Sequence, residues 1–418
     1  MTSPPSIAII GAGPAGLLFA RLLEENGLRD YVVYERDESS APGLWQQGGS
    51  LDLHGPSGQL ALKEAGLLDE FNKVYARWDA SKIHIVNGHS GETIGCFGEG
   101  RDAPEIDRLQ LRQLLLESIP AHKVEWGHGV RSIEIKNPGN SGDRDNGCII
   151  HFTNGSSATG FKLIVGADGG WSKVRPLITS AKPVYSGKMY IEGQLSHNNP
   201  VYRTAKELAG PGTMMALGPC KSLALQQGSD GTYRMYFGLV VPEDFYNHRS
   251  GNAVEKTEAV RELMLSSDKF FATWAPQLKS IAANVEGPFR AWSLHHLKAD
   301  EIGWKRDTAP GVTLLGDAAH LSTPFVGEGV NCAMYDALCL AKCLVNIYEE
   351  GLGFVEASLD KALLSYEEEM FERGRDLIRR SAESEAVLFS ENAMEGVLGF
   401  VDGEHEELLY DVKASSDK

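Results

Sequence analysis

The chain has 418 residues, of which 42% are hydrophobic, and this size and composition indicate a globular protein with two packed domains. Its formal net charge of −17 argues against a surface for nucleic acid or anionic lipid, because both require clustered positive charge. The first residues lack a basic region followed by an apolar run, and no apolar stretch approaches about 18 residues, so we expect neither a signal peptide nor a membrane span.

The six cysteines include no pair with Cys-x-x-Cys spacing. We therefore expect reduced, buried thiols and a cytoplasmic protein. Cys339 and Cys343 lie one helical turn apart in an apolar segment, which indicates core packing rather than metal ligation. We predict no metal site.

A βαβ unit with a glycine-rich loop is predicted at the start of the chain. Residues 6–10 form a short apolar, β-branched run typical of a buried strand, and the loop 11–16 follows without a gap. A helix with an apolar face comes next and stops near Gly27, and a second strand over 31–34 ends at Glu35. This order is typical of a dinucleotide-binding fold.

The glycines of this loop have separate mechanical roles in dinucleotide binding. Gly11 permits the tight turn, Gly13 lets backbone N–H groups approach a pyrophosphate, and Gly16 lets the helix pack closely on the strand. Glu35 follows Gly16 by about 20 residues, where its carboxylate would accept the ribose hydroxyls and repel a 2′-phosphate. The fingerprint therefore predicts NAD or FAD, without choosing between them, and disfavours NADP in this site.

Polar and apolar residues alternate in the next segment. Asp52 and His54 alternate with leucines, so their side chains point away from the leucine side. This pattern fits a solvated edge and a functional role equally. Ser57 is predicted to cap a helix that ends at Gly66.

An amphipathic helix is predicted over residues 105–115. Arg108 and Arg112 are four residues apart, which places both guanidinium groups on one helix face. Two cations on one face suit a phosphate, and they suit ordinary salt bridges equally well. A later insert over 137–147 is so rich in turn formers that we predict an exposed hairpin loop.

Two further buried strands lead into polar loops. The strand over 162–165 runs into a loop that contains Asp168, and the strand over 312–315 runs into Gly316-Asp317. Carboxylates at the carboxyl ends of parallel strands lie where doubly wound sheets bind ligands. A glycine-rich segment then leaves N–H groups free at the start of an apolar helix over 332–348, which suits an electron-rich ring or an oxyanion.

The remaining segments differ in character from the first domain. Apolar and polar residues alternate in stretches over about 182–294, which predicts an antiparallel sheet with one covered face. The covered face of this sheet could form the core or the wall of a ligand site. A long amphipathic helix over 358–389, with acidic residues before basic ones, closes the fold.

These three loops resemble the motifs of the group A flavoprotein monooxygenases, the p-hydroxybenzoate hydroxylase-like family, over nearly the whole chain. The motifs occur in the family order: Gly11 to Gly16 with Glu35, Gly166 to Arg175 around Asp168, and Gly316-Asp317 through Asn331. A closer resemblance, to the tetracycline-inactivating monooxygenases, is carried by segments 48–54, 104–112 and 316–321.

The resemblance implies an α/β fold with a Rossmann-like, GR2-type FAD-binding domain and a second domain on an antiparallel β-sheet. We expect residues 1–76, 102–181 and 295–348 in the first domain, 77–101 and 182–294 in the substrate domain, and a C-terminal bridging helix over 356–395.

The resemblance also implies non-covalently bound FAD. The implied contacts are Gly11, Gly13, Ala15, Gly16, Glu35, Arg36, Gly49, Asp52, Arg112, Asp168, Gly316, Asp317, Pro324, Gly327, Gly329, Val330 and Asn331. Asp317 would bind the ribityl chain, and the loop from Pro324 to Asn331 would lie beside the isoalloxazine ring.

The substrate side departs from the tetracycline-inactivating enzymes. Glu192 replaces a substrate-contacting Gln, Tyr236 aligns with a substrate-facing His, Trp45 replaces an Arg linked to NADPH, and Glu328 replaces the commoner Gln. The resemblance therefore implies shared cofactor contacts but does not by itself identify tetracycline as the substrate. The substrate candidates are Glu192, His54, Tyr236, Thr213, Pro324 and Phe325. We assign no catalytic residue with certainty.

The implied activity is that of a FAD-dependent monooxygenase that consumes NAD(P)H and O2. FAD would stay bound while NADPH visits, and a flavin C4a-hydroperoxide would hydroxylate a phenolic or polycyclic, tetracycline-like polyketide, with antibiotic resistance as one outcome. Glu192, His54 and Tyr236 are candidates to orient or deprotonate a phenol or enol. We expect a small-molecule substrate and a monomer.

Three alternatives stay open at this stage. One is a halogenase or reductase of the same fold, although no Trp-x-Trp-x-Ile-Pro run of the halogenase type is present. A second is Baeyer–Villiger insertion in place of hydroxylation. A third is a flavin-bearing protein that sequesters a polycyclic compound without turnover.

Overall fold

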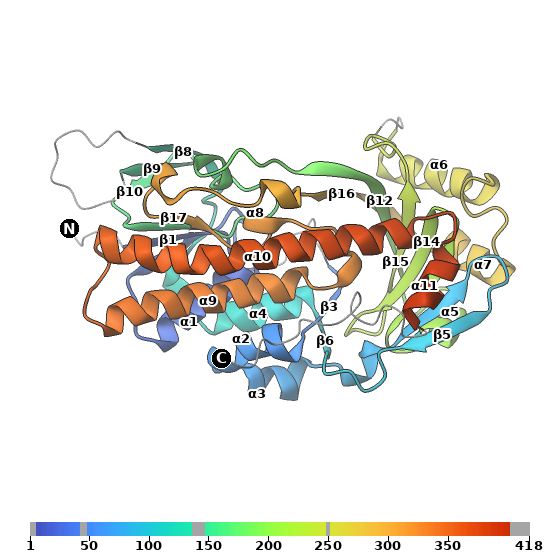
Figure 1. Cartoon of the computed structure of the whole chain (residues 1–418). Coiled ribbons are helices and arrows are strands. Elements are labelled where there is room, and N and C mark those ends of the chain that lie inside the picture. Colours follow the sequence, from blue (N-terminus) through green and yellow to red (C-terminus); the bar gives the residue numbers. More distant parts are fainter. Residues whose placement is uncertain (1–5, 42–47, 136–146, 248–250, 402–418) are drawn as a thin grey trace.

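The computed structural model describes residues 6–41, 48–135, 147–247 and 251–401. Two large sheets lie toward opposite ends of the molecule, and the long helix α10 (Glu356–Leu388) runs between them (Figure 1). Trp45 and most of the predicted hairpin insert lie outside the described residues. The positions of the two sheets and of α10 define where a site between them can form.

The first sheet has five parallel strands in the order β17-β11-β1-β2-β7. Its strands are β1 (Ile7–Ile10), β2 (Tyr31–Tyr34), β7 (Val124–Glu125), β11 (Leu163–Gly166) and β17 (Val312–Leu314). Every residue of β1, β11 and β17 is buried, as parallel strands covered on both faces require. The predicted Rossmann-like α/β fold is confirmed.

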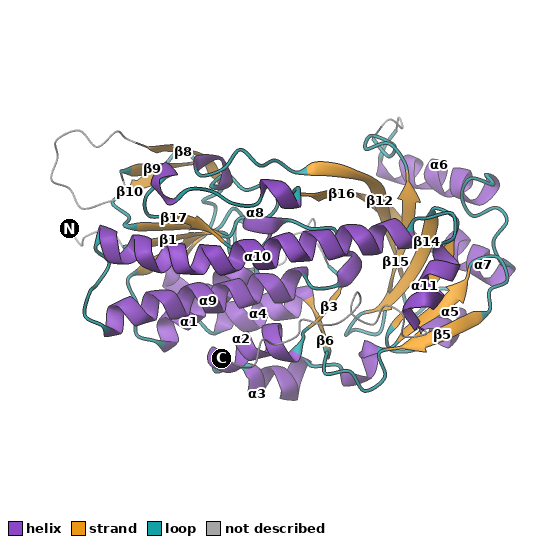
Figure 2. Cartoon of the chain, viewed as in Figure 1, coloured by secondary structure: helices purple, strands orange, loops and turns teal. Residues whose placement is uncertain are grey.

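Helices cover one face of this sheet and a small antiparallel sheet covers the other (Figure 2). The helices are α1 (Pro14–Glu25), α4 (Arg108–Glu117), α9 (Gly329–Glu349) and α10. The small sheet consists of β8 (Val130–Ile135), β9 (Cys148–Phe152) and β10 (Ser157–Thr159). It packs through Phe152, whose ring centroid lies 4.6 Å from that of Tyr34.

Helix α9 corrects one expectation from the sequence. It is the one helix of the described residues that is long and apolar enough to cross a membrane, although no apolar stretch of that length was expected. Of its most apolar window, 61% is buried inside the protein. Its composition therefore reflects its place in the core, between α1 and α10.

The second large sheet has seven strands in the order β16-β12-β15-β14-β13-β4-β5. They are β4 (Ile83–Asn87), β5 (Thr93–Phe97), β12 (Val184–Leu195), β13 (Thr213–Gly218), β14 (Lys221–Gln227), β15 (Tyr233–Val240) and β16 (Glu286–His296). All pairs are antiparallel except β13 with β4. The predicted second domain on an antiparallel sheet is thus confirmed in its architecture.

One face of this sheet carries an apolar core with three helices that the sequence analysis did not anticipate. These are α5 (Tyr202–Ala209), α6 (Ala253–Ser266) and α7 (Pro276–Asn284). The opposite face carries polar and aromatic side chains from the same strands, including Tyr236 and Glu192. Side chains alternate along each strand, so the covered core face leaves this second face for a ligand.

Two predicted helix starts are wrong. Residues Glu105–Asp107 form strand β6, which pairs with β3 (Ser50–Asp52), and α4 begins only at Arg108. Ser57 caps no helix, because it lies inside a π-helical turn over Gly55–Gln59 that precedes α2 (Leu60–Glu64) and α3 (Leu68–Glu70). In the first case long-range strand pairing overrides the helical pattern.

The predicted C-terminal helix is confirmed, since α10 spans Glu356–Leu388. A further helix, α11 (Ala393–Val401), turns back and packs against β13. The C-terminal part of the chain thus reaches from the parallel sheet to the seven-stranded sheet (Figure 1).

Candidate functional site

The glycine-rich loop has one open side. A Cβ atom on Gly11, where φ is +107°, would lie 2.5 Å from the carbonyl oxygen of Ala167, and one on Gly16 would lie 2.2 Å from that of Gly11. A Cβ on Gly13 would meet no atom within 4 Å. Helix α1 also has no side-chain cap and no acidic residue in its first turn. Its amides are therefore presented to an open side, which suits an anion.

Glu35 and Arg112 join the loop to the neighbouring strand. The buried Glu35 carboxylate accepts hydrogen bonds from the N–H groups of Ala12, at 2.6 Å, and Asp37, at 3.0 Å. Arg112 donates to the Ala12 carbonyl and to Asp37, both at 3.0 Å. Arg36 is exposed beside them. The structure thus brings these predicted cofactor residues together at the carboxyl edge of the parallel sheet.

Two carboxyl groups at the same edge have unusual environments. One Asp168 oxygen accepts the Lys173 N–H at 2.6 Å, and the other is buried with no hydrogen-bond partner among the described residues. Burial raises the pKa of Asp168 and that of Asp317. Asp317 is nevertheless reached by solvent, although the residues around it in the sequence are buried. Asp317 is therefore accessible to a ligand at this edge of the sheet.

Gly316 is the reason that Asp317 can take this place. Its φ is +60°, and a Cβ there would lie 2.9 Å from that of Ala333 on α9 and 3.6 Å from that of Ala15 on α1. Only a residue without a side chain lets β17 run into this turn between two helices.

Arg108 is a site residue that the sequence analysis left open. Its Nε is buried with no hydrogen-bond partner among the described residues, and burial lowers its pKa. Asp317 and Tyr236 are the groups whose charges act on it. A buried N–H group that lacks a hydrogen bond is costly unless a ligand supplies the acceptor. The four-residue spacing from Arg112 was the available signal.

Asn331 ties the first turn of α9 to the segment after β3. It accepts the backbone N–H of His54 at 2.8 Å and donates to the carbonyl of Asp52 at 2.9 Å. The Asp52 carboxylate contacts His54 Nε2 at 3.0 Å and Arg101 at 2.9 Å. Burial alone would raise the pKa of Asp52, but His54 and Arg101 outweigh it and lower that pKa.

The loop before α9 exposes the positions expected beside a flavin. Pro324 and Gly327 are exposed, Gly327 has φ +70°, and a Cβ on Gly329 would meet no atom within 4 Å. Val330 is half-buried. No side chain caps α9 and its first turn holds no acidic residue. Its first amides are thus available to an electron-rich group.

The substrate candidates lie on the free face of the seven-stranded sheet and next to it. Glu192 and Tyr236 are direct cross-strand neighbours. Tyr190 lies in the next row of this face, 5.8 Å from Tyr236 and 6.0 Å from Phe325, ring centroid to ring centroid. Phe325 belongs to the loop before α9, so these rings connect the sheet with that loop. Thr213 lies two strands away, at the start of β13.

Glu192 has both oxygens engaged. Arg234 donates to one oxygen and Trp292 Nε1 donates to the other at 2.7 Å. Arg234 in turn packs against Gly48, where a Cβ would lie 2.2 Å from its guanidinium, and Gly49 faces the Tyr236 hydroxyl. Burial raises the pKa of Tyr236, so its hydroxyl stays protonated and can donate.

A buried cluster near the site contains three potential metal ligands. The ligand atoms of His320, Cys332 and Asp336 lie within 4.8 Å of one another. His320 Nε2 lies 2.5 Å from Asp336, which also binds Arg373 at 2.7 Å and the Gly316 N–H at 3.0 Å. A direct imidazole–carboxylate contact and an adjacent guanidinium identify an ion-pair network, so the cluster carries no metal assignment.

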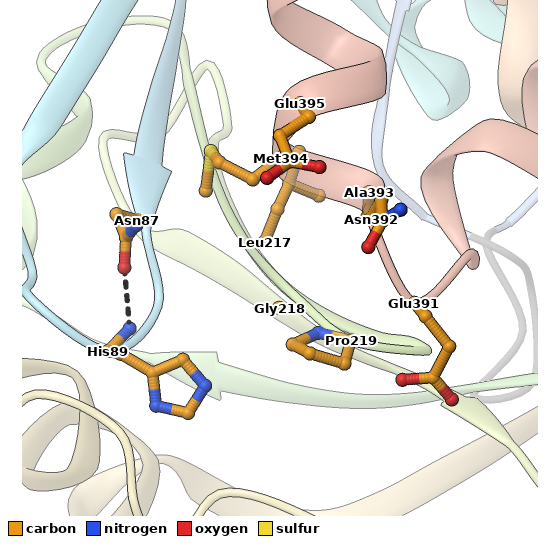
Figure 3. A pocket seen from close by; sticks show the side chains of 10 residues that line it. All are labelled: Asn87, His89, Leu217, Gly218, Pro219, Glu391, Asn392, Ala393, Met394 and Glu395. Carbon is orange, nitrogen blue, oxygen red and sulfur yellow. Dashed lines mark hydrogen bonds between the residues drawn. The ribbon is translucent and has the colours of Figure 1, made fainter.

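A separate small cavity of about 130 Å³ lies between α11 and the strand ends around Leu217 (Figure 3). Asn87 and His89 line one side of it, and residues 391–395 line the other. None of its lining residues is a predicted cofactor or substrate residue. We therefore place the site at the edge of the parallel sheet and not at this cavity.

The comparisons with known proteins found relatives that match most of the chain. Residues 5–381 match the family model described as "FAD binding domain". The monooxygenase asqM of Emericella nidulans is 32% identical, over 93% of this chain and 96% of its own. The 3-amino-4-hydroxybenzoate 2-monooxygenase of Streptomyces cremeus is 28% identical, over 81% and 78%.

Two solved structures show the same fold. Klebsiella pneumoniae HpxO complexed with FAD and uric acid has a TM-score of 0.72 at 23% identity, covering 97% of this chain and 93% of that one. The tetracycline destructase Tet(51) has a TM-score of 0.68 at 18% identity, covering 96% of each chain. At these identities the likeness concerns the fold alone.

Proposed function

Since the chain belongs to the FAD-binding-domain family of p-hydroxybenzoate hydroxylase-like, group A monooxygenases and is a FAD-dependent monooxygenase, we propose that it hydroxylates a phenolic or polycyclic aromatic substrate. We also propose that the reaction consumes NADPH and that the protein is a monomer. We place it in the cytoplasm, where the six free thiols would stay reduced. Bound FAD, when reduced by NADPH, supplies the activation of O2 that this chemistry needs.

The residues at the edge of the parallel sheet fit FAD. Glu35 would take the adenosine ribose, and the open side of Gly13 would take the pyrophosphate at the amides of α1. Asp317, reached by solvent, and Arg108, with an unsatisfied Nε, would serve the middle of the cofactor. The amides at the start of α9 would face the isoalloxazine ring, with Asn331 holding the segment around Asp52 against them.

The substrate proposal is based on the aromatic rings that join the seven-stranded sheet to the loop before α9. Tyr236, Tyr190 and Phe325 follow one another at centroid distances of 5.8 and 6.0 Å. Planar aromatic molecules are bound well by such edge and tilted ring contacts. A substrate on this face would lie beside the loop before α9, where oxygen transfer is proposed. The Streptomyces cremeus relative, a 3-amino-4-hydroxybenzoate 2-monooxygenase, is likewise named for oxygenation of a hydroxylated aromatic ring.

The three polar candidates have different roles in this proposal. Glu192 has both oxygens engaged and would fix Arg234 and Trp292 rather than accept a proton. Tyr236 would donate a hydrogen bond, because burial keeps its hydroxyl protonated. His54 would accept the phenol or enol proton, with its ring held in place by the Asp52 carboxylate, which lies 3.0 Å from its Nε2.

The proposal is tested by following NADPH and product together. The purified protein, which should be yellow, is offered tetracyclines, anthraquinones and simple phenols, and the products are identified by mass spectrometry. We expect at least one compound to stimulate NADPH oxidation with a matching amount of singly oxygenated product. Release of H2O2 alone across the panel would refute hydroxylation. An oxygenated ring-expanded ester or lactone would instead support Baeyer–Villiger insertion.

Matched variants test the assigned residues. His54→Asn should lower the substrate-stimulated rate most at pH values where the phenol or enol is not ionised by itself and must lose its proton to a base, and Tyr236→Phe should raise KM. The control is His89→Asn, which changes an exposed histidine of the β4–β5 turn and should leave both parameters unchanged. Equal effects of His54→Asn and His89→Asn would refute the role of His54.

A further inference from the structure

The last turns of α10 hold the loop that precedes α9. Ser381 bonds to Thr323, and the Ser384 hydroxyl donates to the Phe325 carbonyl at 2.9 Å. Leu377, one turn earlier, is buried in a cluster with Val326. These positions recur every three to four residues, so one face of α10 lies along the loop. The conformation of the loop therefore depends on α10 as well as on its own sequence.

Arg380 and Glu328 form a two-pronged ion pair at the end of this contact. The two guanidinium Nη atoms donate to the two carboxylate oxygens at 2.8 and 2.6 Å. Glu328 is only 5% exposed, and Arg380 has a second partner in Asp376 at 2.7 Å. The hydrogen bond with Glu328 is the largest influence that raises the pKa of Arg380. Two parallel hydrogen bonds fix the orientation of the two side chains and also make the ion pair strong.

The place of Glu328 gives this pair an electrostatic consequence. Glu328 directly precedes Gly329, the first residue of α9, where backbone N–H groups concentrate partial positive charge. A bare carboxylate there would offset that positive charge. Arg380 neutralises the carboxylate, so the start of α9 retains its positive potential.

We propose that Arg380 is a positioning residue that, through Glu328, sets the potential that the start of α9 presents to bound FAD. The proposal rests on the placement of FAD beside this loop given under the proposed function. Reduction adds electron density to the flavin, so an uncompensated Glu328 would disfavour the reduced cofactor. Arg380 thus acts on the redox equilibrium without touching the substrate.

The experiment measures the midpoint potential of bound FAD in four variants. Arg380→Met should lower it, by about tenfold in the equilibrium between reduced and oxidised cofactor, which is about 30 mV for a two-electron couple. Glu328→Gln should raise it. The double variant should return to within about threefold of the unmodified protein, because both charges are gone. The control, Arg379→Met, removes an exposed arginine from the next position of the same helix and should cause no shift.

The outcomes separate charge from structure. Amide hydrogen exchange over 323–331 in the FAD-free protein should be faster in Arg380→Met and in the double variant alike, since both lose the contact. A merely structural role would therefore leave the double variant with the same altered potential as Arg380→Met, and that result would overturn the proposal.

Two further results bear on the same question. If Arg380→Met does not fold, Glu328→Gln decides, and an unchanged potential in that variant overturns the proposal. Failure of the unmodified protein to bind FAD would instead overturn the cofactor placement on which the proposal rests.

Discussion

Replacing Gly11 or Gly13 by alanine should separate folding from cofactor binding. At Gly11 the φ of +107° is strained for alanine, which costs about 1–3 kcal/mol. Its Cβ would also lie 2.5 Å from the Ala167 carbonyl oxygen, and displacing that backbone adds about 1–3 kcal/mol. We therefore expect Gly11→Ala to destabilise the FAD-free protein by about 2–6 kcal/mol.

Gly13→Ala should behave in the opposite way. The residue has φ −81° and ψ 176°, which alanine adopts freely, and the new Cβ would meet no atom within 4 Å. The loss of a glycine cap costs at most about 1 kcal/mol. The methyl group would, however, stand on the open side that we assign to the pyrophosphate. FAD affinity should fall by at least about tenfold, or about 1.4 kcal/mol.

The assay measures both quantities on each variant. Urea unfolding of FAD-free protein gives the stability, and quenching of flavin fluorescence on titration gives the affinity. The reasoning fails if FAD-free Gly11→Ala is within about 1 kcal/mol of the unmodified protein. It also fails if Gly13→Ala binds FAD normally, because the open side of the loop would then have another purpose.

Three other substitutions test the buried charges. Asp336→Asn should destabilise the protein by about 3–5 kcal/mol in urea at pH 7, because Arg373 would lose its buried partner. The pKa of Asp336 is lowered, so the stabilisation that ionised Asp336 provides exists above about pH 4 and disappears on acidification. Burial raises the pKa of Glu105 from 4.5 to about 7, so Glu105 lowers the free energy of unfolding increasingly as the pH rises between these values. Glu105→Gln should therefore raise the free energy of unfolding by up to about 3 kcal/mol at pH 8 and change it little at pH 4. Glu35→Gln should weaken FAD binding about tenfold and lower the unfolding midpoint slightly at pH 7, measured by titration and urea, since the amide oxygen can still accept the Ala12 N–H but the amide NH2 cannot accept the Asp37 N–H.

Local patterns predicted the cofactor end of the molecule. The run from residue 6 to Glu35 specifies strand, turn, helix and strand from adjacent residues, and the observed β1, α1 and β2 match it. Gly11 and Gly16 have the close packing expected of them. Asp168 and Asp317 follow buried parallel strands, and in such sheets the carboxyl ends of the strands meet at one edge.

Long-range contacts were beyond the reach of the sequence. Strand β6 was predicted as helix, because its pairing with β3 depends on a segment more than 50 residues earlier. The network around Asp336 combines residues from α8 (Asp317–His320), α9 and α10, whose spacing carries no recognisable motif. Arg380 was visible only as one of several basic residues in a helix. Partners that are chosen by packing leave no local signature.

The length of α10 limits which sequence changes this helix can tolerate. At about 1.5 Å per residue, its 33 residues form a helix about 50 Å long. This helix contacts the domain of the parallel sheet and also, through the ion pair of Glu385 with Lys188, strand β12 of the other sheet. Each residue added to a helix rotates everything after it by about 100°. A single insertion midway along α10 would therefore turn Arg380, Ser384 and Glu385 away from their partners together. We expect this helix to tolerate substitutions on its outer face and to tolerate no change in length.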